Sequence, residues 1–179
     1  MNDYLGKMKG TSKSPPAVGL GEIFWSWIGA FLGIAAVAYA QLQIVDGTDH
    51  VLLVGSFGAS AVLLYGAITS PLAQPRNLVG GHVVSALVGV TAFQLLPSTM
   101  WLAAALGVAT AIALMHATKT LHPPGGATAL IAVIGGDQIH DLGYLYALAP
   151  AGLGAAIMLV VALLINNIPQ GRRYPEFWI

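Results

Sequence analysis

Apolar residues along this chain form long runs separated by short polar segments. Five runs are about as long as a membrane-spanning helix and one is shorter; they cover residues 22–45, 51–69, 78–97, 101–118 and 143–166, and the short run covers 123–136. A helix that crosses a bilayer needs about 20 mostly apolar residues and is apolar on all sides. The strands of a membrane barrel would instead alternate polar and apolar residues. The pattern therefore predicts an all-α, polytopic transmembrane helical bundle.

Composition agrees with this prediction and excludes several classes of function. The 179 residues are 56% apolar and 8% charged, whereas a soluble domain carries about 25% charged residues. Seven Lys and Arg balance seven Asp and Glu, so no basic surface exists for nucleic acid. The chain has no cysteine, which excludes disulfides and thiolate metal sites. No histidine pair has helical ligand spacing, and the runs hold no carboxylate apart from Glu22 at the start of the first, so we expect no metal and no cofactor.

The charges in the polar segments predict how often the chain crosses the membrane. If the N-terminus is cytoplasmic and each run crosses once, residues 1–21, 70–77, 119–122 and 167–179 lie on the cytoplasmic side. These segments hold every basic residue of the chain: Lys7, Lys9, Lys13, Arg76, Lys119, Arg172 and Arg173. The opposite side receives Asp46, Asp49, Asp137 and Asp141. By the positive-inside rule we expect six crossings of the cell's inner (plasma) membrane with both termini cytoplasmic. A transit peptide in an organelle protein is the alternative for residues 1–20.

A short motif occurs in the second run and again in the fifth. Residues 58–61 read Gly-Ala-Ser-Ala and residues 126–129 read Gly-Ala-Thr-Ala. Each run is the middle one of three, and three is odd, so the second half enters the membrane inverted, as in many transporters. The alternative is chance recurrence in a chain rich in Gly and Ala. We divide the chain into an N-terminal arm (1–20), two three-helix repeats (21–97 and 98–168) that form a 3+3 inverted repeat, and a C-terminal tail (169–179).

Longer motifs resemble a known family. Residues 122–130 (HPPGGATAL) are similar to the signature of the HPP family of small integral membrane proteins. Residues 55–61 (GSFGASA), 70–77 (SPLAQPRN) and 80–82 (GGH) are similar to its second conserved block, and 166–167 and 172–175 to its C-terminal end. The resemblance implies nitrite transport, a role attributed to plastid and cyanobacterial members. Many bacterial members have no assigned substrate.

The Pro-Pro-Gly-Gly sequence at 123–126 predicts a helix that begins inside the membrane. Proline fits the first turn of a helix, and a residue before proline is extended. The run of 14 residues, 123–136, rises about 21 Å as a helix, against a hydrocarbon core of about 30 Å. The free N–H groups at such a helix end carry partial positive charge and suit an anion. The alternative is a tight turn before a short helix.

The second run offers a counterpart, because Gly55 and Gly58 are three residues apart and could interrupt its helix. Inverted topology would point the two helix N-termini at each other across the midplane, so that the second and fifth spans are both broken. Hydroxyl groups would add hydrogen bonds without placing a full charge in lipid. The candidate substrate-binding residues are Gly55, Ser56, Gly58, Ala59, Ser60, His122, Gly125, Gly126, Ala127 and Thr128.

Four basic or titratable residues are candidates for a proton relay or a gate: His122, His116, His82 and Arg76. A histidine changes charge near neutral pH, and an ionisable residue inside a membrane usually has a function. Each histidine has a structural alternative as a helix cap or as a partner of a backbone carbonyl, and Arg76 has one as a topology marker. Four other residues are expected at the membrane surface: His50 and His140 in solvent, and Tyr144 and Tyr146 in an interfacial aromatic belt.

The leading hypothesis is transport of a small monovalent inorganic anion, with nitrite implied by the resemblance. A channel of the same architecture is the alternative. An intramembrane enzyme with Ser60 beside His82 or His122 lacks a carboxylate to orient the base, so we expect no enzyme activity, and a scaffold would not need broken spans. Six short helices enclose a transport path more easily when several copies of the chain assemble. We therefore expect three kinds of partner: the bilayer, the anion, and further copies of this chain in a homo-oligomer.

Overall fold

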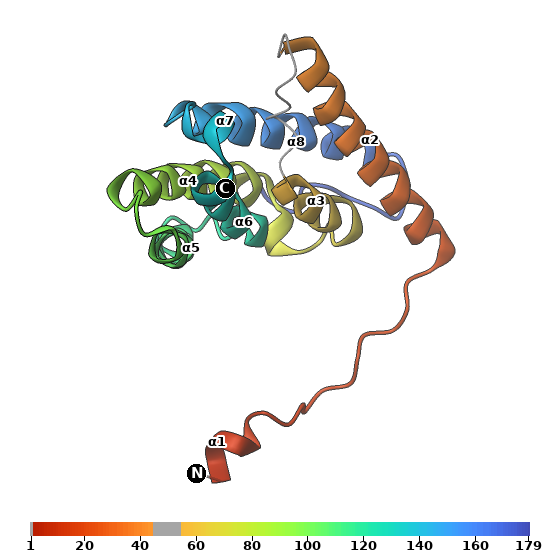
Figure 1. The fold of residues 1–179 in the computed structure, drawn as a ribbon. Helices are drawn as coiled ribbons and strands as arrows, with labels where there is room; N and C mark the ends of the chain where they lie inside the picture. The colour runs from red at the N-terminus through yellow and green to blue at the C-terminus, as the bar shows by residue number, and fades with distance from the viewer. Residues whose placement is uncertain (1, 45–54) are drawn as a thin grey trace.

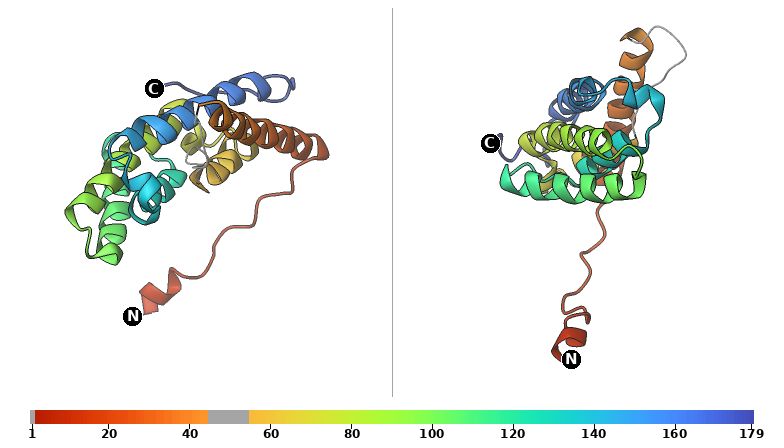
Figure 2. Two further views of the ribbon diagram at one scale, coloured as in Figure 1. Left: turned by 45° about the horizontal axis from the view of Figure 1, so that its top comes forward. Right: turned by 60° about the vertical axis from the view of Figure 1, so that its left-hand side comes forward.

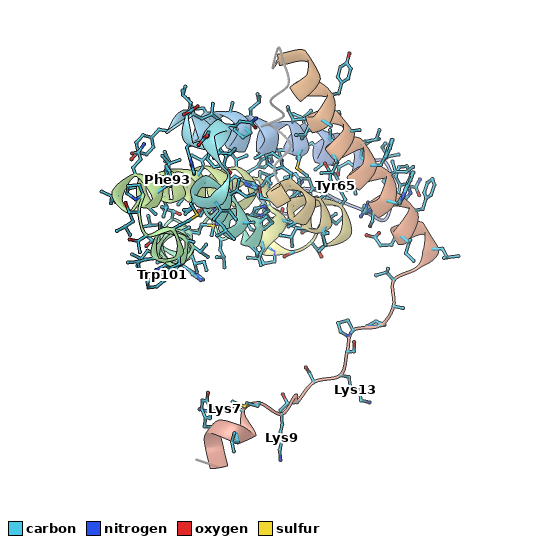
Figure 3. The ribbon with its side chains drawn as sticks, in the orientation of Figure 1. Lys7, Lys9, Lys13, Tyr65, Phe93 and Trp101 are labelled. Carbon is cyan, nitrogen blue, oxygen red and sulfur yellow. The ribbon has the colours of Figure 1, made fainter. Side chains whose placement is uncertain are left out.

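The computed structural model describes residues 2–44 and 55–179, whose regular elements are all helices, with no strand among them. The expected all-α class is thereby confirmed. The elements are α1 (Asn2–Gly6), α2 (Leu20–Ile44), α3 (Gly55–Ala61), η1 (Val62–Gly66), η2 (Pro71–Ala73), α4 (Pro75–Leu95), α5 (Met100–Ala117), α6 (Pro123–Ile134), α7 (Asp137–His140), η3 (Ala147–Gly152) and α8 (Leu153–Ile165). An extended segment carries α1 away from the bundle (Figure 1). Lys7, Lys9 and Lys13 lie along this N-terminal arm (Figure 3).

Four helices of the described chain are long and apolar enough to cross a membrane: Leu20–Ala40, Pro75–Leu95, Met100–Ala117 and Ala147–Ile165. They correspond to the first, third, fourth and sixth apolar runs. The outward faces of α2 and α5 carry exposed large apolar side chains, among them Trp27, Phe31 and Trp101, as expected of surfaces that contact lipid. Residue 45 of the first expected run, 51–54 of the second, and Asp46, Asp49 and His50 lie outside the described residues.

The second and fifth runs form short helices. The helix α6 has 12 residues and begins at Pro123, so it rises about 18 Å, less than the hydrocarbon core. His122 before it has φ −140° and ψ 104°, which confirms the extended geometry expected before proline. The 7 residues of α3 are followed directly by the 5 of η1. Gly58 lies within α3, so the helix continues through it, whereas Gly55 starts α3 and the residues directly before it lie outside the described ones.

The sixth run is interrupted, which its composition did not predict. Within η3, Ala149 has extended backbone angles, with φ −142° and ψ 124°, and Pro150 follows it. Proline has no N–H to donate to the preceding turn. The segment that enters α8 is therefore a kinked helix rather than the continuous span expected from residues 143–166.

The helix α4 is central to the bundle and packs against α5, α6 and η3. Figure 2 shows α4 and α5 side by side in its right-hand view. Glycines on α4 let α6 approach closely: a Cβ atom added to Gly81 would lie 2.5 Å from Cβ of His122, and one added to Gly89 would overlap the carbonyl oxygen of Ala129. Small residues at helix contacts are typical of membrane bundles, where close packing replaces the hydrophobic effect.

Four polar segments that the charge pattern assigns to one side meet at one end of the bundle. Arg172 in the C-terminal tail is buried and forms an ion pair of 2.8 Å with Glu22 at the start of α2. Its guanidinium group also donates to the carbonyl oxygen of Tyr65 near the end of η1. The Asn77 side chain in α4 donates to the carbonyl oxygen of Leu121 at 2.8 Å.

The tail also holds the loop between η1 and α4. The Tyr174 hydroxyl group donates to the carbonyl oxygen of Ala73 at 2.8 Å, and the backbone N–H of Glu176 donates to the Gln74 side chain at 2.8 Å. Burial raises the pKa of the Tyr174 hydroxyl group, so it is an uncharged donor at neutral pH. Gln74 in turn donates to the carbonyl oxygens of Ile68 and Ser70. The loop is therefore fixed from both sides.

A tyrosine on η1 packs into two glycines on α2. The ring of Tyr65 covers Gly29 and Gly33, and its hydroxyl group donates to the carbonyl oxygen of Met158 in α8 at 3.1 Å. Figure 3 labels this side chain between η1 and α2. The Gly-x-x-x-Gly row thus packs a helix within the chain.

We predict that Gly33→Ala destabilises the fold, because the added Cβ atom would lie 2.7 Å from Cζ of Tyr65. Overpacking of this kind costs about 1–3 kcal/mol, so thermal unfolding in detergent should occur at a lower temperature. Gly21→Ala on the same helix is the control, since nothing lies within 4 Å of its added Cβ atom. Equal melting temperatures for the two variants would contradict this packing.

Candidate functional site

A chain of hydrogen bonds between side chains lies in the centre of the bundle. Ser60 Oγ is 2.8 Å from Nε2 of His82 and 2.8 Å from Nε2 of His122. His82 Nδ1 is 2.7 Å from Oγ1 of Thr128, and His122 Nδ1 is 2.8 Å from the carbonyl oxygen of Leu72. The four side chains are fully buried. We call Ser60, His82, His122 and Thr128 the polar cluster.

The carbonyl oxygen of Leu72 determines the direction of every hydrogen bond when both imidazoles are neutral. A carbonyl only accepts, so His122 Nδ1 carries the hydrogen and its Nε2 accepts from the Ser60 hydroxyl group. Ser60 has then used its one hydrogen and accepts from Nε2 of His82. The remaining nitrogen, His82 Nδ1, accepts from the hydroxyl group of Thr128. Each group therefore donates its hydrogen bond to the next one in the series, from Thr128 through His82, Ser60 and His122 to Leu72.

Three helices and one loop bring the polar cluster together. Ser60 comes from α3, His82 from α4, Thr128 from α6, and His122 precedes α6. The ring of Phe57 in α3 lies 5.1 Å from the His82 ring, between centroids, and also packs against Gly154 in α8. The Phe57 ring thus gives the His82 imidazole an apolar contact in addition to its hydrogen bonds.

The first turn of α3 holds a second serine with different surroundings. Ser56 is fully buried, and its Oγ has no hydrogen-bond partner among the described residues. It precedes Ser60 by four residues, so both side chains lie on the same face of the helix. A hydroxyl group buried without a partner loses its hydration with no compensating bond. Ser56 therefore has a hydrogen available for a ligand beside the polar cluster.

The structure brings some of the sequence-predicted site residues together and leaves others apart. Ser56, Ser60, His82, His122, Gly125 and Thr128 are buried in the centre. Gly55, Gly58 and Ala59 are exposed on the outer face of α3, and Gly126 and Ala127 are half-buried. The space between Ser60 and Thr128, where facing helix ends were expected, holds the imidazole ring of His82.

Two of the expected relay or gating residues lie away from the polar cluster. His116 is exposed on α5. Arg76 is half-buried, with its guanidinium carbon 5.8 Å from the centre of the Phe177 ring in the tail. The Asn166 side chain at the end of α8 bonds Arg172 and the carbonyl oxygen of Leu64, and no described hydrogen bond joins it to Arg76.

Three groups have surroundings that the sequence did not predict. Tyr146, expected at the membrane surface, is buried and donates to the backbone carbonyl of Thr128 at 3.2 Å. His140, expected in solvent, stacks on Phe93 with ring centroids 3.6 Å apart. The backbone oxygen of Leu72 carries no signal in the sequence, since any residue would supply it.

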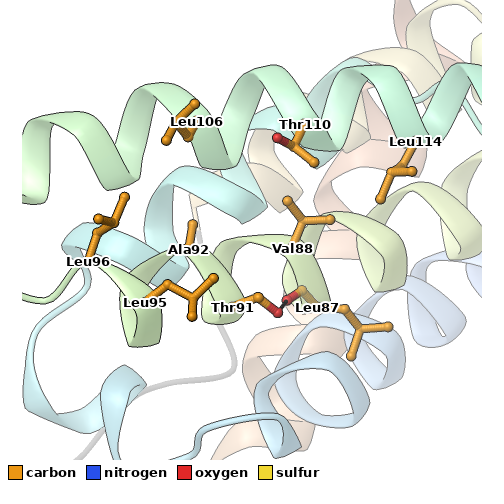
Figure 4. Close-up of a pocket in the computed structure, with 9 residues that line it drawn as sticks. All are labelled: Leu87, Val88, Thr91, Ala92, Leu95, Leu96, Leu106, Thr110 and Leu114. Carbon is orange, nitrogen blue, oxygen red and sulfur yellow. Dashed lines mark hydrogen bonds between the residues drawn. The ribbon is translucent and has the colours of Figure 1, made fainter.

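An apolar groove lies apart from the polar cluster. It lies between α4 and α5, has a volume of about 420 Å³, and is lined by Leu87, Val88, Thr91, Ala92, Leu95, Leu96, Leu106, Thr110 and Leu114 (Figure 4). Both helices are long enough to cross a membrane. Its apolar lining matches a lipid-facing surface rather than a site for a polar substrate.

The polar cluster offers hydroxyl and imidazole groups but no ligand set for a metal ion. Among the described residues no three His, Cys, Asp or Glu side chains lie close enough to hold one. The helices α3 and α6 carry no Asp, Glu, Lys or Arg. The arrangement can therefore bind a small polar molecule or anion by hydrogen bonds, and can move protons between its imidazoles.

Comparison with known proteins assigns the chain to a family. Residues 15–175 match the family described as "HPP, transmembrane region". The chain belongs to the HPP family. The resemblance carried by residues 122–130 is thereby confirmed, and the chain is a membrane protein with transmembrane helices.

Two relatives in Dictyostelium discoideum are named only as transmembrane proteins. One is 47% identical over 178 residues, which are 98% of this chain and 57% of the relative. The other is 43% identical over 180 residues, covering 98% of this chain and 63% of the relative. The chain thus spans less than two thirds of the length of these relatives. No solved structure matches it.

Neighbouring glycines of the HPP motif allow a test of the packing behind the polar cluster. We predict that Gly125→Ala destabilises the fold, because its Cβ atom would lie 2.7 Å from Ser85 Oγ and 2.9 Å from the carbonyl oxygen of Gly81. Gly126→Ala meets only Val108, at 3.9 Å, and should melt at or above the wild-type temperature, since Ala favours a helix over Gly by about 1 kcal/mol. Thermal unfolding of both variants in detergent measures the difference. A Gly126→Ala variant that is less stable than Gly125→Ala would contradict the packing of Gly125 and the open space at Gly126.

Proposed function

We propose that this HPP protein transports a small monovalent anion across a membrane, with nitrite as the first substrate to test. The observation that carries the proposal is the fully buried Ser56 hydroxyl group, which has no partner in residues 2–44 and 55–179 and lies one helical turn from the polar cluster. In lipid an unsatisfied polar group costs several kcal/mol. A ligand that accepts a hydrogen bond from the Ser56 hydroxyl group removes this cost, so a small oxyanion suits the position.

The charge of the surroundings supports a site that binds an anion weakly enough to release it. The helices α3 and α6 place no fixed charge beside the polar cluster, and Arg172 is already paired with Glu22. A hydroxyl donor replaces part of the water around a monovalent anion without the strong attraction of a buried arginine. Transport requires binding that is favourable on entry and reversible on exit.

The positions of the short helices support the 3+3 inverted repeat. Ser60 in α3 and Thr128 in α6 occupy the same place in the two Gly-Ala-small-Ala motifs. Both bond to the same imidazole, Ser60 at Nε2 of His82 and Thr128 at Nδ1. Two equivalent residues that approach one central group from opposite sides are typical of an inverted pair, which forms the substrate site in many transporters.

The contacts at one end of the bundle support six crossings. The tail contacts the start of α2 through Arg172 and Glu22 and the loop before α4 through Tyr174 and Ala73. Asn77 joins that loop to the segment before α6. An even number of crossings between each pair of these segments brings them to one side. The positive-inside rule supports a cytoplasmic location for that side, and we propose that the membrane is the plasma membrane.

A channel with the same architecture is the second candidate function. A carrier saturates and exchanges its substrate across the membrane, whereas a channel shows neither counterflow nor steep saturation. Counterflow of labelled nitrite in liposomes distinguishes the two.

We predict that Ser56→Ala weakens transport without weakening the fold. The substitution removes a donor to the anion but breaks no internal hydrogen bond, and a hydrogen bond to a charged group is worth about 1.5–3 kcal/mol. The nitrite concentration at half-maximal flux into liposomes should therefore rise about tenfold or more. The melting temperature should stay at the wild-type value.

Thr110→Val is the matched control, since it deletes an exposed hydroxyl group from the lipid-facing groove of α5, and its flux should equal that of the wild type. Nitrate, formate and chloride fluxes, measured beside nitrite, define the substrate class. If the nitrite concentration at half-maximal flux is unchanged in Ser56→Ala, Ser56 does not bind the anion. Absence of protein-dependent flux for all four anions would overturn the proposed function.

A further inference from the structure

The hydrogens of the polar cluster balance its acceptors when both histidines are neutral. Thr128, His82, Ser60 and His122 each donate one hydrogen, and the acceptors are His82 Nδ1, Ser60 Oγ, His122 Nε2 and the carbonyl oxygen of Leu72. In this neutral state no ring N–H is left for an anion.

The cluster has room for one additional proton at a defined place. Thr128 Oγ1 is 2.7 Å from His82 Nδ1 and also 3.3 Å from the carbonyl oxygen of Pro124, one turn earlier in α6. If His82 Nδ1 gains a proton, it becomes the donor to Thr128, and the Thr128 hydroxyl group turns its hydrogen to Pro124. The only bonds made or broken are the N–H bond that forms on His82 and the O–H bond that breaks in the hydronium ion that supplies the proton. Every donor still has an acceptor.

The protonated cluster carries a positive charge that its surroundings do not balance. The titratable or charged side chains on the elements packed against His82 and His122 have other partners or are exposed. Tyr146 donates to the Thr128 backbone, Tyr65 to Met158 and Tyr174 to Ala73, while Arg76 lies over Phe177 and Glu22 pairs with Arg172. The side chains of His116 and Glu176 are exposed. The helices α3 and α6 and the loop residues 70–74 contain no carboxylate. A buried charge without a partner is costly in a membrane, so an anion must accompany it.

From this balance we infer that the polar cluster takes up one proton with each anion, so that the protein is an electroneutral symporter of protons and anions. The inference rests on the proposed transport function. It names the proton as the coupling ion, His82 as its acceptor, and the Thr128 hydroxyl group as the group that rotates to accommodate it. Ser56 on the adjacent turn of α3 supplies a donor to the anion.

The test uses the purified full chain in liposomes with nitrite outside and a pH-sensitive dye inside. Initial rates are measured above those of protein-free vesicles, because nitrous acid crosses lipid by itself. We expect an inward proton gradient of one pH unit to raise the initial rate several-fold, with one proton appearing inside for each nitrite. A potassium diffusion potential set with valinomycin should leave the rate unchanged.

Two results would overturn the inference in different ways. Nitrite flux that follows the potassium potential and ignores the proton gradient would refute proton coupling while leaving transport intact. Absence of protein-dependent flux would refute the transport function and the coupling with it.

Variants of Thr128 test the position of the proton. We expect Thr128→Val to lose the stimulation by the gradient, because protonated His82 then has no acceptor at Nδ1, and Thr128→Ser to keep it. Thr110→Val should behave as the wild type. Full stimulation in a folded Thr128→Val protein would contradict the proposed role, and the wild-type stoichiometry decides the coupling even if that variant does not fold.

Discussion

The Ser60 hydroxyl group has one hydrogen to donate and lies between two imidazole nitrogens, each 2.8 Å away. Inside a membrane no water is at hand to satisfy whichever nitrogen it leaves. The carbonyl oxygen of Leu72 removes the choice, because it requires a hydrogen on His122 Nδ1. The protonation of two histidines and the orientation of two hydroxyl groups follow from this single acceptor.

This requirement explains why a loop and a tail that are far from the HPP motif in the sequence are held by so many hydrogen bonds. Leu72 lies in η2, which is held by hydrogen bonds from Gln74 to the preceding loop and from Tyr174 to Ala73. Arg172 fastens the tail to α2 and to the end of η1. A movement of this end of the bundle would displace the acceptor of His122. The packing at this end of the bundle and the polar cluster are therefore coupled, as the proposed transport function requires.

The sequence predicted the helical class, the start of α6 at Pro123 and the extended His122, because local rules for proline and runs of apolar residues govern them. It also placed Ser60 and Thr128 in equivalent motifs. It could not predict that His82 fills the space between them, since that depends on α4 packing closely through Gly81 and Gly89. The kink at Ala149 and the buried Tyr146 likewise follow from tertiary packing.

Nitrogen-15 NMR of the histidine-labelled protein in bilayers tests the ordered cluster most directly, because imidazole nitrogens with and without hydrogen resonate at well-separated positions. At neutral pH without substrate we predict a hydrogen on Nδ1 of His122 and on Nε2 of His82, assigned by the loss of each signal in His122→Gln and His82→Gln. A hydrogen on Nε2 of His122, with Nδ1 bare, would refute the ordered cluster, since the carbonyl oxygen of Leu72 would then face a nitrogen that cannot donate.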